Sequence, residues 1–103
     1  MPLVLHGASA VLSPLVRQAT RYGARLGKPH GVPETQIKKA IKNGIAKINT
    51  DTDLRLAFTA GLRKMVMTDR KQFDPRKILG PSTELMQKTV EHRMKLFGSV
   101  GKA

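Results

Sequence analysis

The spacing of apolar residues along the chain predicts two short strands and four helices. The strands are brief apolar runs at Leu3–Leu5 and Ile45–Ile48, and the helices follow from apolar residues repeated every three or four positions. The helices are predicted at about residues 13–22, 34–42, 53–68 and 80–97. Each strand is followed by a polar loop and then by a helix, which is the order of a βαβα unit in an α/β protein.

The third predicted helix has the clearest apolar stripe. Its members share one face at helical spacing: Leu54, Phe58, Leu62, Met65 and Val66. Gly61 weakens this helix by about 1 kcal/mol relative to alanine, which indicates close packing at that point. Thr52 or Asp53 is expected to cap the start of the helix.

The boundaries of the other helices are predicted from glycine and proline. Asn43–Gly44 predicts the end of the second helix, because helices often end at a glycine in the left-handed backbone conformation. The last helix is expected to open at Gly80–Pro81, after a polar connection that starts at Asp69, and to stop at Gly98. Its apolar stripe consists of Leu85, Met86, Thr89, Val90, Met94 and Phe97.

The loops after the two predicted strands contain small and polar residues. Gly7 and Ser9 follow the first strand, and Asn49, Asp51 and Thr52 follow the second. Backbone N–H groups and the start of a helix can bind an anion, so a phosphate could lie between the two loops. Ordinary helix capping accounts for the same residues equally well, and spacing alone does not choose between the two interpretations. A carboxylate beside a phosphate would suit Asp51 only if it orients a hydroxyl or holds a cation.

His6 is the candidate metal ligand or acid/base because it directly follows the first strand. A lone histidine is more often structural, and a catalytic zinc needs about three protein ligands. His30 lies in a loop rich in glycine and proline, and His92 lies on the polar side of the last helix. Neither is an obvious partner, so the chain cannot build a zinc site by itself.

Arg76 is a second candidate for contact with a phosphate. It lies in the segment Phe73-Asp74-Pro75-Arg76. It could clamp a phosphate through its guanidinium group, or it could form a surface pair with Asp74, which would contribute little to stability. The residues by themselves favour the surface interpretation.

Length and composition indicate one domain of modest size. The chain has 103 residues, of which 40% are hydrophobic, so residues 1–103 can form at most one compact domain. No apolar run approaches the roughly 20 residues that a membrane span needs. The absence of cysteine makes a cytoplasmic location the default expectation.

The charge of the chain raises the question of nucleic acid. There are 19 basic residues against 7 acidic ones, a net charge of +12, which is a legitimate indication of a polyanionic partner. However, no basic run exceeds two residues, and the four aromatic residues do not suggest a platform for base stacking. A small basic helical nucleic-acid-binding protein is therefore kept as the alternative, and basic helices around an anionic ligand are the favoured interpretation.

Two parallel strands with this much helix cannot form a complete sheet, since a parallel pair needs neighbours to bury it. The chain is therefore expected to be the end of a larger α/β protein. The obvious closed form is the eight-stranded barrel, in which the loops after the seventh and eighth strands frequently bind phosphate.

Five segments of the chain resemble the C-terminal third of the class II, zinc-dependent fructose-bisphosphate aldolases. They are L-H-G-A-S, G-V-P-E-T-Q-I-K-K-A-I, A-K-I-N-T-D-T-D-L-R-L-A-F-T, F-D-P-R-K and L-F-G-S-V-G-K-A, and they occur in the family's order from Leu3 to Ala103. The resemblance implies the last two βα units of a TIM (β/α)₈ barrel with terminal helices, an incomplete barrel. It also implies reversible aldol cleavage of fructose 1,6-bisphosphate to dihydroxyacetone phosphate and glyceraldehyde 3-phosphate.

The same resemblance implies a role for each candidate residue. His6 is implied as one of three histidines that hold the catalytic zinc, which polarises the ketone and stabilises the enediolate. Gly7, Ser9, Asp51 and Thr52 are implied to bind the phosphate of the dihydroxyacetone-phosphate half. Asn49 is implied to contact the substrate near the enediolate, and Arg76 to reach the other phosphate in a neighbouring subunit's site. A monovalent cation near the phosphate is a further family feature.

The other two zinc ligands and the catalytic acid/base belong to a part of the family's sequence that this chain lacks. The isolated chain is therefore expected to be inactive and to need the rest of the barrel, and its first strand is expected to leave an open, aggregation-prone edge. Met1 stands just before that strand, as if a reading frame had been truncated or restarted there. A non-catalytic remnant that associates with aldolase subunits through Arg76 and the last helix is a third hypothesis. The preference for fructose or tagatose bisphosphate cannot be inferred from these residues.

Overall fold

The computed structural model describes residues 2–5, 13–27 and 31–102, and it contains the two strands and four helices that the apolar pattern predicts. In chain order the elements are β1 (Val4–Leu5), α1 (Ser13–Arg21), α2 (Glu34–Lys42), β2 (Lys47–Ile48), α3 (Thr52–Thr68) and α4 (Pro75–Phe97). No helix in the described ranges is long and apolar enough to cross a lipid bilayer.

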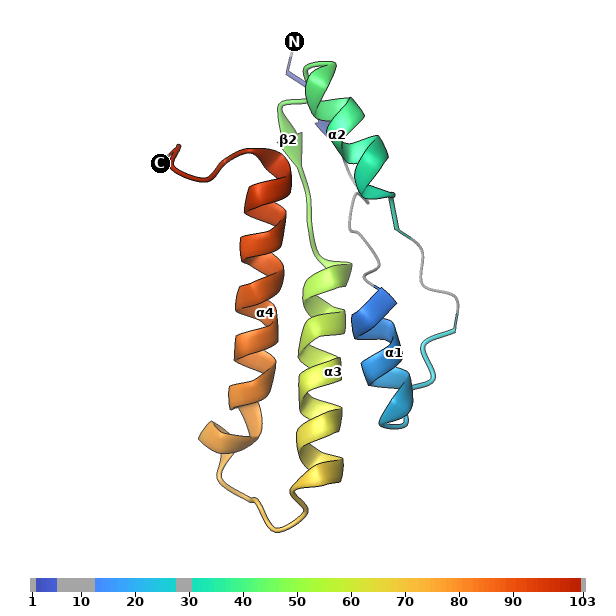
Figure 1. Ribbon diagram of the computed structural model, residues 1–103, viewed down its shortest axis with the longest axis vertical. Coiled ribbons are helices and arrows are strands. Elements are labelled where there is room, and N and C mark those ends of the chain that lie inside the picture. Colours follow the sequence, from blue (N-terminus) through green and yellow to red (C-terminus); the bar gives the residue numbers. More distant parts are fainter. Residues whose placement is uncertain (1, 6–12, 28–30, 103) are drawn as a thin grey trace.

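The helices form a layer with α3 in the middle. α3 and α4 run antiparallel, joined by the loop at the lower end of Figure 1, and α1 packs against the other side of α3. α2 lies at the opposite end of the hairpin, near the two strands (Figure 1), and its Glu34 pairs with His92 of α4. The molecule is mostly helical, with the small sheet at one end of the layer.

β1 and β2 pair in parallel, as the strand–helix–strand order predicts. Val4 lies opposite Lys47 and Leu5 opposite Ile48. The Leu3 carbonyl accepts from the amides of Ala46 and Lys47 at 3.0 and 3.2 Å. Both strands are shorter than predicted, and Leu3 and Val4 are 63% and 41% exposed. Apolar side chains at the start of β1 are therefore exposed.

The buried face of α3 differs from the predicted stripe. Phe58 and Val66 are exposed, and the other three predicted members are only partly buried. The core instead consists of small and medium side chains from α1, α3 and the segment after α1: Leu15, Ala19, Ala24, Leu56, Ala57 and Ala60. The prediction was wrong because α3 packs against a helix on each side, and alanines allow those helices to approach closely.

Gly61 marks the closest approach between α3 and α4, which confirms the close packing expected from its position. A Cβ atom at Gly61 would lie 2.7 Å from both the Cα and the backbone nitrogen of Ser82. The Ser82 hydroxyl donates to the Phe58 carbonyl at 2.7 Å across the same contact. Because the obstructing atoms are backbone, no rotamer change can relieve the clash.

Replacing Gly61 with alanine is expected to lower the free energy of unfolding by about 1–3 kcal/mol, the usual cost of overpacking. Helix propensity alone would instead raise it by about 1 kcal/mol, so the sign of the change is diagnostic. Urea denaturation measures it. The matched control is Glu84→Ala at an exposed position of α4, expected to change stability by less than about 0.5 kcal/mol. A stabilised Gly61→Ala variant would contradict the close approach.

α4 begins at Pro75, so the prediction of a start at Gly80–Pro81 was wrong. Asp74 is the N-cap, and its Oδ1 accepts from the Arg76 amide at 3.0 Å. Pro75 suits the first helical position because its missing N–H has no partner to lose there. Pro81 lies inside the helix, and proline is a usual cause of helix bending. Figure 1 shows a bend in the lower part of α4. Gly98 ends α4 in the left-handed conformation as predicted, with φ of 72°.

Candidate functional site

The carboxyl edge of the two-stranded sheet carries the first group of predicted site residues. The Asn49 amide donates to the Leu5 carbonyl at 3.0 Å, so the end of β2 lies directly beside the end of β1. Asn49, Asp51 and Thr52 then form the loop into α3. His6, Gly7 and Ser9 lie outside the described residues. The structure thus brings Asn49 next to the residue that precedes His6.

Asp51 is the N-cap residue of α3, which corrects the prediction that Thr52 or Asp53 caps this helix. Its carbonyl accepts from the amides of Leu54 and Arg55 at 3.0 and 3.1 Å. Its carboxylate forms an exposed pair with Arg55, with Oδ2 at 2.9 Å from Nη2. Such a surface pair adds little stability, but it leaves a cation beside the loop and offsets the charge of Asp51.

Asp53 and Arg93 form a buried ion pair between α3 and α4. Their side chains are 0% and 4% exposed, and the Arg93 Nε lies 3.3 Å from the Asp53 Oδ2. The Arg93 Nη2 also donates to the Thr50 hydroxyl at 3.3 Å. The Arg93 guanidinium carbon lies 4.7 Å from the centre of the Phe97 ring. Arg93 therefore connects α4 to the start of α3 and to the loop before it.

Burial raises the pKa of the Asp53 carboxyl above its usual range, and the nearby Arg93 guanidinium opposes this rise only in part. The desolvation of the carboxylate thus outweighs the attraction of its partner. The sequence analysis missed Arg93 entirely and considered Asp53 only as a cap. Helical spacing contained a signal, because Arg93 follows the buried Ser82 and Thr89 on one face of α4.

An apolar hollow of about 240 Å³ lies beside this pair. β2, α3 and α4 all contribute to it, chiefly through Ile48, Leu54, Val90, Met94 and Phe97. Among the described residues that line it, Thr50 and Arg93 are the polar ones. The polar loop therefore lies at the rim of an apolar surface that the described residues leave uncovered.

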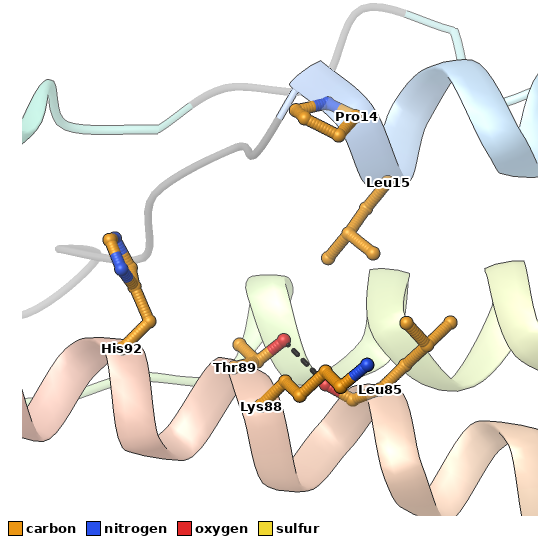
Figure 2. A pocket seen from close by; sticks show the side chains of 6 residues that line it. All are labelled: Pro14, Leu15, Leu85, Lys88, Thr89 and His92. Atoms are coloured by element: carbon orange, nitrogen blue, oxygen red, sulfur yellow. Dashed lines mark hydrogen bonds between the residues drawn. The ribbon is translucent and has the colours of Figure 1, made fainter.

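A second apolar hollow of about 240 Å³ lies between α1 and α4 (Figure 2). Leu15 points from α1 toward Leu85 and Thr89 of α4, and Lys88 and His92 lie at the edges. The Thr89 hydroxyl donates to the Leu85 carbonyl at 2.8 Å. This hollow offers few polar groups to a phosphate and includes none of the predicted site residues.

The basic side chains gather in a different hollow, of about 400 Å³, between α1 and α3. Arg17, Arg21 and Lys64 line it with Gln18 and Tyr22. The cations are exposed on helix surfaces, as expected for a solvated basic face. This hollow shares no residue with the Asn49–Thr52 loop, so an experiment can distinguish general attraction of anions from binding at the loop.

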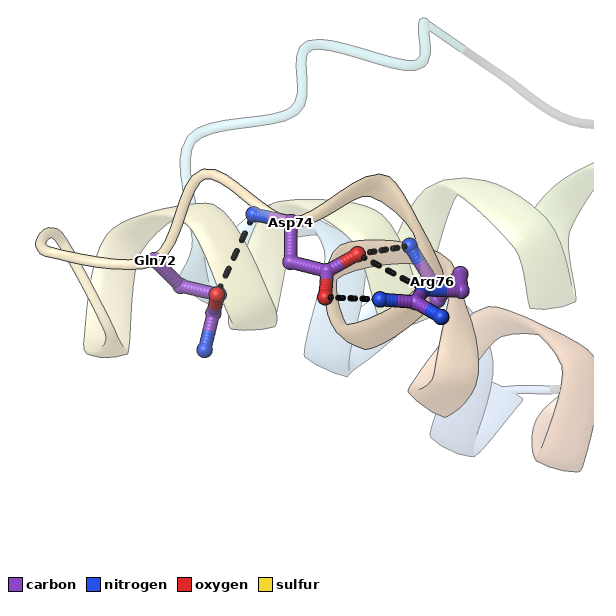
Figure 3. A network of polar contacts seen from close by, with 3 residues as sticks. All are labelled: Gln72, Asp74 and Arg76. Atoms are coloured by element: carbon purple, nitrogen blue, oxygen red, sulfur yellow. Dashed lines mark hydrogen bonds and ion pairs between the residues drawn. The ribbon is translucent and has the colours of Figure 1, made fainter.

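Arg76 lies on the first turn of α4, at the opposite end of the hairpin from the strands. Figure 3 shows it folded back on Asp74, with Nη2 at 3.1 Å from Oδ2 and Nε at 3.2 Å from Oδ1. The Gln72 side chain accepts from the Asp74 amide at 3.1 Å. The Arg76 side chain is 91% exposed. The structure therefore does not bring Arg76 to the loop of its own chain, and it leaves the residue accessible from outside.

The Asp74 cap is expected to weaken at acidic pH. The hydrogen bonds from the Arg76 side chain and amide lower the pKa of the Asp74 carboxyl. Because the folded-state pKa is lowered, the stabilisation that the ionised Asp74 carboxylate gives to the start of α4 is present at neutral pH. It is lost as the pH falls through that lowered pKa. Hydrogen exchange of the Arg76 amide should accelerate, relative to the intrinsic rate, over the same pH range. In Asp74→Asn the cap carries no titratable charge, so a pH effect that persists in this variant would contradict the assignment.

The described part of the chain does not form a metal site by itself. No three His, Cys, Asp or Glu side chains among those residues lie close enough together to hold a metal ion. His92 pairs with Glu34 on α2, away from the Asn49–Thr52 loop.

Sequence comparison identifies the family of the chain. A sequence model described as fructose-bisphosphate aldolase class-II matches residues 29–102, well over half of the chain. A fructose-bisphosphate aldolase of Thermus caldophilus is 57% identical over 102 residues, covering 99% of this chain and 33% of the relative. The aldolase of Treponema pallidum is 46% identical, over 99% of this chain and 31% of its own length. The aldolase of Helicobacter pylori J99 is 45% identical, over 99% of this chain and 33% of its own length. The chain thus spans about a third of the curated relatives that it matches. It belongs to the class II fructose-bisphosphate aldolase family.

Proposed function

We propose that this chain supplies the C-terminal third of a class II fructose-bisphosphate aldolase and acts only together with the rest of the barrel. The reaction is reversible cleavage of fructose 1,6-bisphosphate to dihydroxyacetone phosphate and glyceraldehyde 3-phosphate. The observation that carries the proposal is the contact between Asn49 and Leu5, which joins the carboxyl ends of two parallel strands. In barrel enzymes this edge holds the active site.

The proposed fold is the last two βα units of a (β/α)₈ barrel followed by the terminal helix, so that residues 1–103 are one partial domain. The exposure of Leu3 and Val4 supports this, because parallel strands are normally buried on both faces. Further strands would cover β1, and the apolar hollow beside β2, α3 and α4 would also be filled.

The proposed phosphate site lies between the two loops. We assign to it Gly7 and Ser9, which follow β1 in the sequence, and Asn49, Asp51 and Thr52, which follow β2. The start of α3 contributes the partial positive charge of a helix N-terminus. The pairing of Asp51 with Arg55 offsets the charge that would otherwise repel a phosphate. Asn49 contacts the substrate near the enediolate, and a monovalent cation near the phosphate completes the proposed site.

His6 is the proposed zinc ligand of this chain. A catalytic zinc takes about three protein ligands, so two more come from the remainder of the barrel, together with the acid/base residue. Zinc supplies a Lewis acid for the substrate carbonyl when bound. We propose this site for His6 on the resemblance of L-H-G-A-S to the family and on its position directly after β1.

Arg76 is proposed to bind the second phosphate in the site of a neighbouring subunit. Its 91% exposure and its distance along the hairpin from the strands support a role outside its own site. To reach a substrate it would exchange its contact with Asp74 for a contact with phosphate. The proposal therefore includes a homo-oligomer. We also propose a cytoplasmic location, the default for a sequence without cysteine.

Binding of dihydroxyacetone phosphate to the full chain tests the proposed phosphate site. In ¹H–¹⁵N NMR spectra, the amide signals of Gly7, Ser9, Asn49, Asp51 and Thr52 should shift with a common saturation curve. Unphosphorylated dihydroxyacetone is the control and should shift none of them. Shifts confined to the basic hollow of Arg17, Arg21 and Lys64 would overturn the proposed site and favour the nucleic-acid alternative, whose binding falls steeply with salt.

Activity requires the missing part of the barrel. The chain can be mixed with the two thirds of the Thermus caldophilus aldolase that it does not match, and we call the resulting complex the reconstituted barrel. The high identity of the two proteins over the shared third supports a compatible interface.

A further inference from the structure

Arg93 of α4 contacts the loop between β2 and α3 and the start of α3. Its Nη2 donates to the Thr50 hydroxyl at 3.3 Å, and its Nε lies 3.3 Å from the Asp53 Oδ2. Thr50 and Asp53 flank Asp51 and Thr52 in the sequence. A single guanidinium group is therefore attached to the chain on both sides of the proposed phosphate-binding residues.

The attachment lies in a buried part of the molecule. The Arg93 and Asp53 side chains are 4% and 0% exposed. The Phe97 ring, 4.7 Å from the guanidinium carbon, restricts the position of that group further. Charged hydrogen bonds and ion pairs hold geometry best where water is excluded. Motion of α4 at Arg93 would consequently be transmitted to the loop.

Stability alone does not account for this arrangement. Apolar residues of similar volume often stabilise a protein as well as a buried ion pair does. Here the Arg93 attraction only partly offsets the cost of burying Asp53, since the pKa of Asp53 remains raised. The contacts of Arg93 with Thr50 and Asp53 point instead to the geometry that the pair imposes on the loop.

We propose that Arg93 is a positioning residue, which fixes Thr50 and Asp53 and thereby sets the direction of the Asn49–Thr52 backbone toward the phosphate. Arg93 itself does not touch the substrate. This inference rests on the proposed function, because it assigns the loop a phosphate to bind. It extends the site to a residue of the last helix that the sequence analysis did not consider.

The test uses two variants of the reconstituted barrel. Thr50→Val removes the loop contact and leaves the Asp53–Arg93 pair, and Asp53→Leu/Arg93→Met replaces the pair with apolar residues. Both are expected to keep the melting temperature close to that of the unaltered protein. Both should raise the KM for fructose 1,6-bisphosphate about 10–100-fold, the usual effect of a misplaced binding group. The kcat should fall less, because phosphate binding is shared by the ground and transition states.

Thr83→Val is the matched control, since its hydroxyl donates to the Leu79 carbonyl within α4, at 3.0 Å. An unchanged KM in both loop variants would reduce Arg93 to a packing role and overturn the inference. If the unaltered reconstituted barrel is inactive, the proposed function fails. The inference is then judged on the full chain by hydrogen exchange of the Asn49–Thr52 amides. Exchange should accelerate in Thr50→Val but not in Thr83→Val, and equal exchange would overturn it.

Discussion

Replacing Arg93 with methionine is expected to lower the free energy of unfolding at pH 7 by about 3–5 kcal/mol, the cost of leaving one charge of a buried pair without its partner. The Asp53 side chain is 0% exposed and Arg93 is its partner across the α3–α4 contact. Methionine fills much of the same volume, so the loss reports the charge rather than a cavity. Urea denaturation followed by circular dichroism measures the change. Lys95→Met is the matched control at an exposed position of α4, expected to change stability by less than about 0.5 kcal/mol.

The pH dependence of the stability lost in Arg93→Met distinguishes an electrostatic cause from a packing defect. Burial already raises the pKa of Asp53, and removing Arg93 removes the main attraction that opposes the rise. A raised folded-state pKa means that the carboxyl favours folding below its unfolded value and that this contribution is lost as the pH rises through the folded value. The destabilisation of Arg93→Met should therefore shrink on acidification, as Asp53 becomes neutral. An equal loss at pH 4 and pH 7 would contradict the electrostatic account.

A double replacement gives a second check on the pair. Asp53→Leu/Arg93→Met removes both charges and leaves apolar side chains at the contact. It is expected to recover most of the stability lost in Arg93→Met, because no uncompensated charge remains. Recovery of stability without recovery of substrate affinity is the combination that identifies a positioning role.

Replacing His6 with alanine is expected to abolish zinc-dependent activity of the reconstituted barrel. Loss of a residue that only supports a metal ligand costs about 10–100-fold, and loss of one of the three ligands themselves should cost more. Zinc content of the purified complex should fall together with the rate of cleavage. The strands themselves should still pair, since β1–β2 contacts are made by the backbone.

His92→Ala is the control for this experiment. His92 lies on α4 and pairs with Glu34, so its loss should leave zinc content and cleavage unchanged. If His6→Ala retains its zinc and its activity, the assignment of His6 as a ligand is wrong. Loss of zinc in His92→Ala instead would move the metal to the α2–α4 side of the molecule.

Much of the fold could be predicted because local patterns determine it. The apolar repeats predict α1 and α2 closely, and the strand–helix–strand order predicts the parallel pairing of β1 with β2. The buried face of α3 could not be predicted in the same way. It depends on tertiary packing, because α1 and α4 flank α3 closely. The small alanine and glycine side chains fit at these contacts, and the larger Phe58 and Val66 remain exposed.

The start of α4 shows a different limit. Asp74–Pro75 and Gly80–Pro81 both look like helix starts in the sequence, since proline suits the first turn. Asp74 adds a capping carboxylate that Gly80 cannot supply, and the earlier start was therefore favoured. Pro81 is then accommodated inside the helix at the cost of a backbone hydrogen bond.

Of the candidate site, only the loop after β2 could be located from the sequence. Polar residues directly after an apolar strand mark Asn49, Asp51 and Thr52, and the structure brings Asn49 to the end of β1. Arg93 is separated from Thr50 by 43 positions, and only the folding of α4 against α3 brings the two together. Helical spacing places Arg93 on the same face of α4 as Thr89, but it does not identify Thr50 and Asp53 as its partners.

The rate of fructose 1,6-bisphosphate cleavage by the reconstituted barrel shows whether this chain acts as one part of an aldolase barrel. We expect that neither part cleaves the substrate alone. We also expect that the rate rises with added chain to a plateau at equal amounts of the two parts, and that a zinc chelator abolishes it. A complex that forms in this ratio but stays inactive with zinc present would contradict that role, as would cleavage by the 103-residue chain on its own.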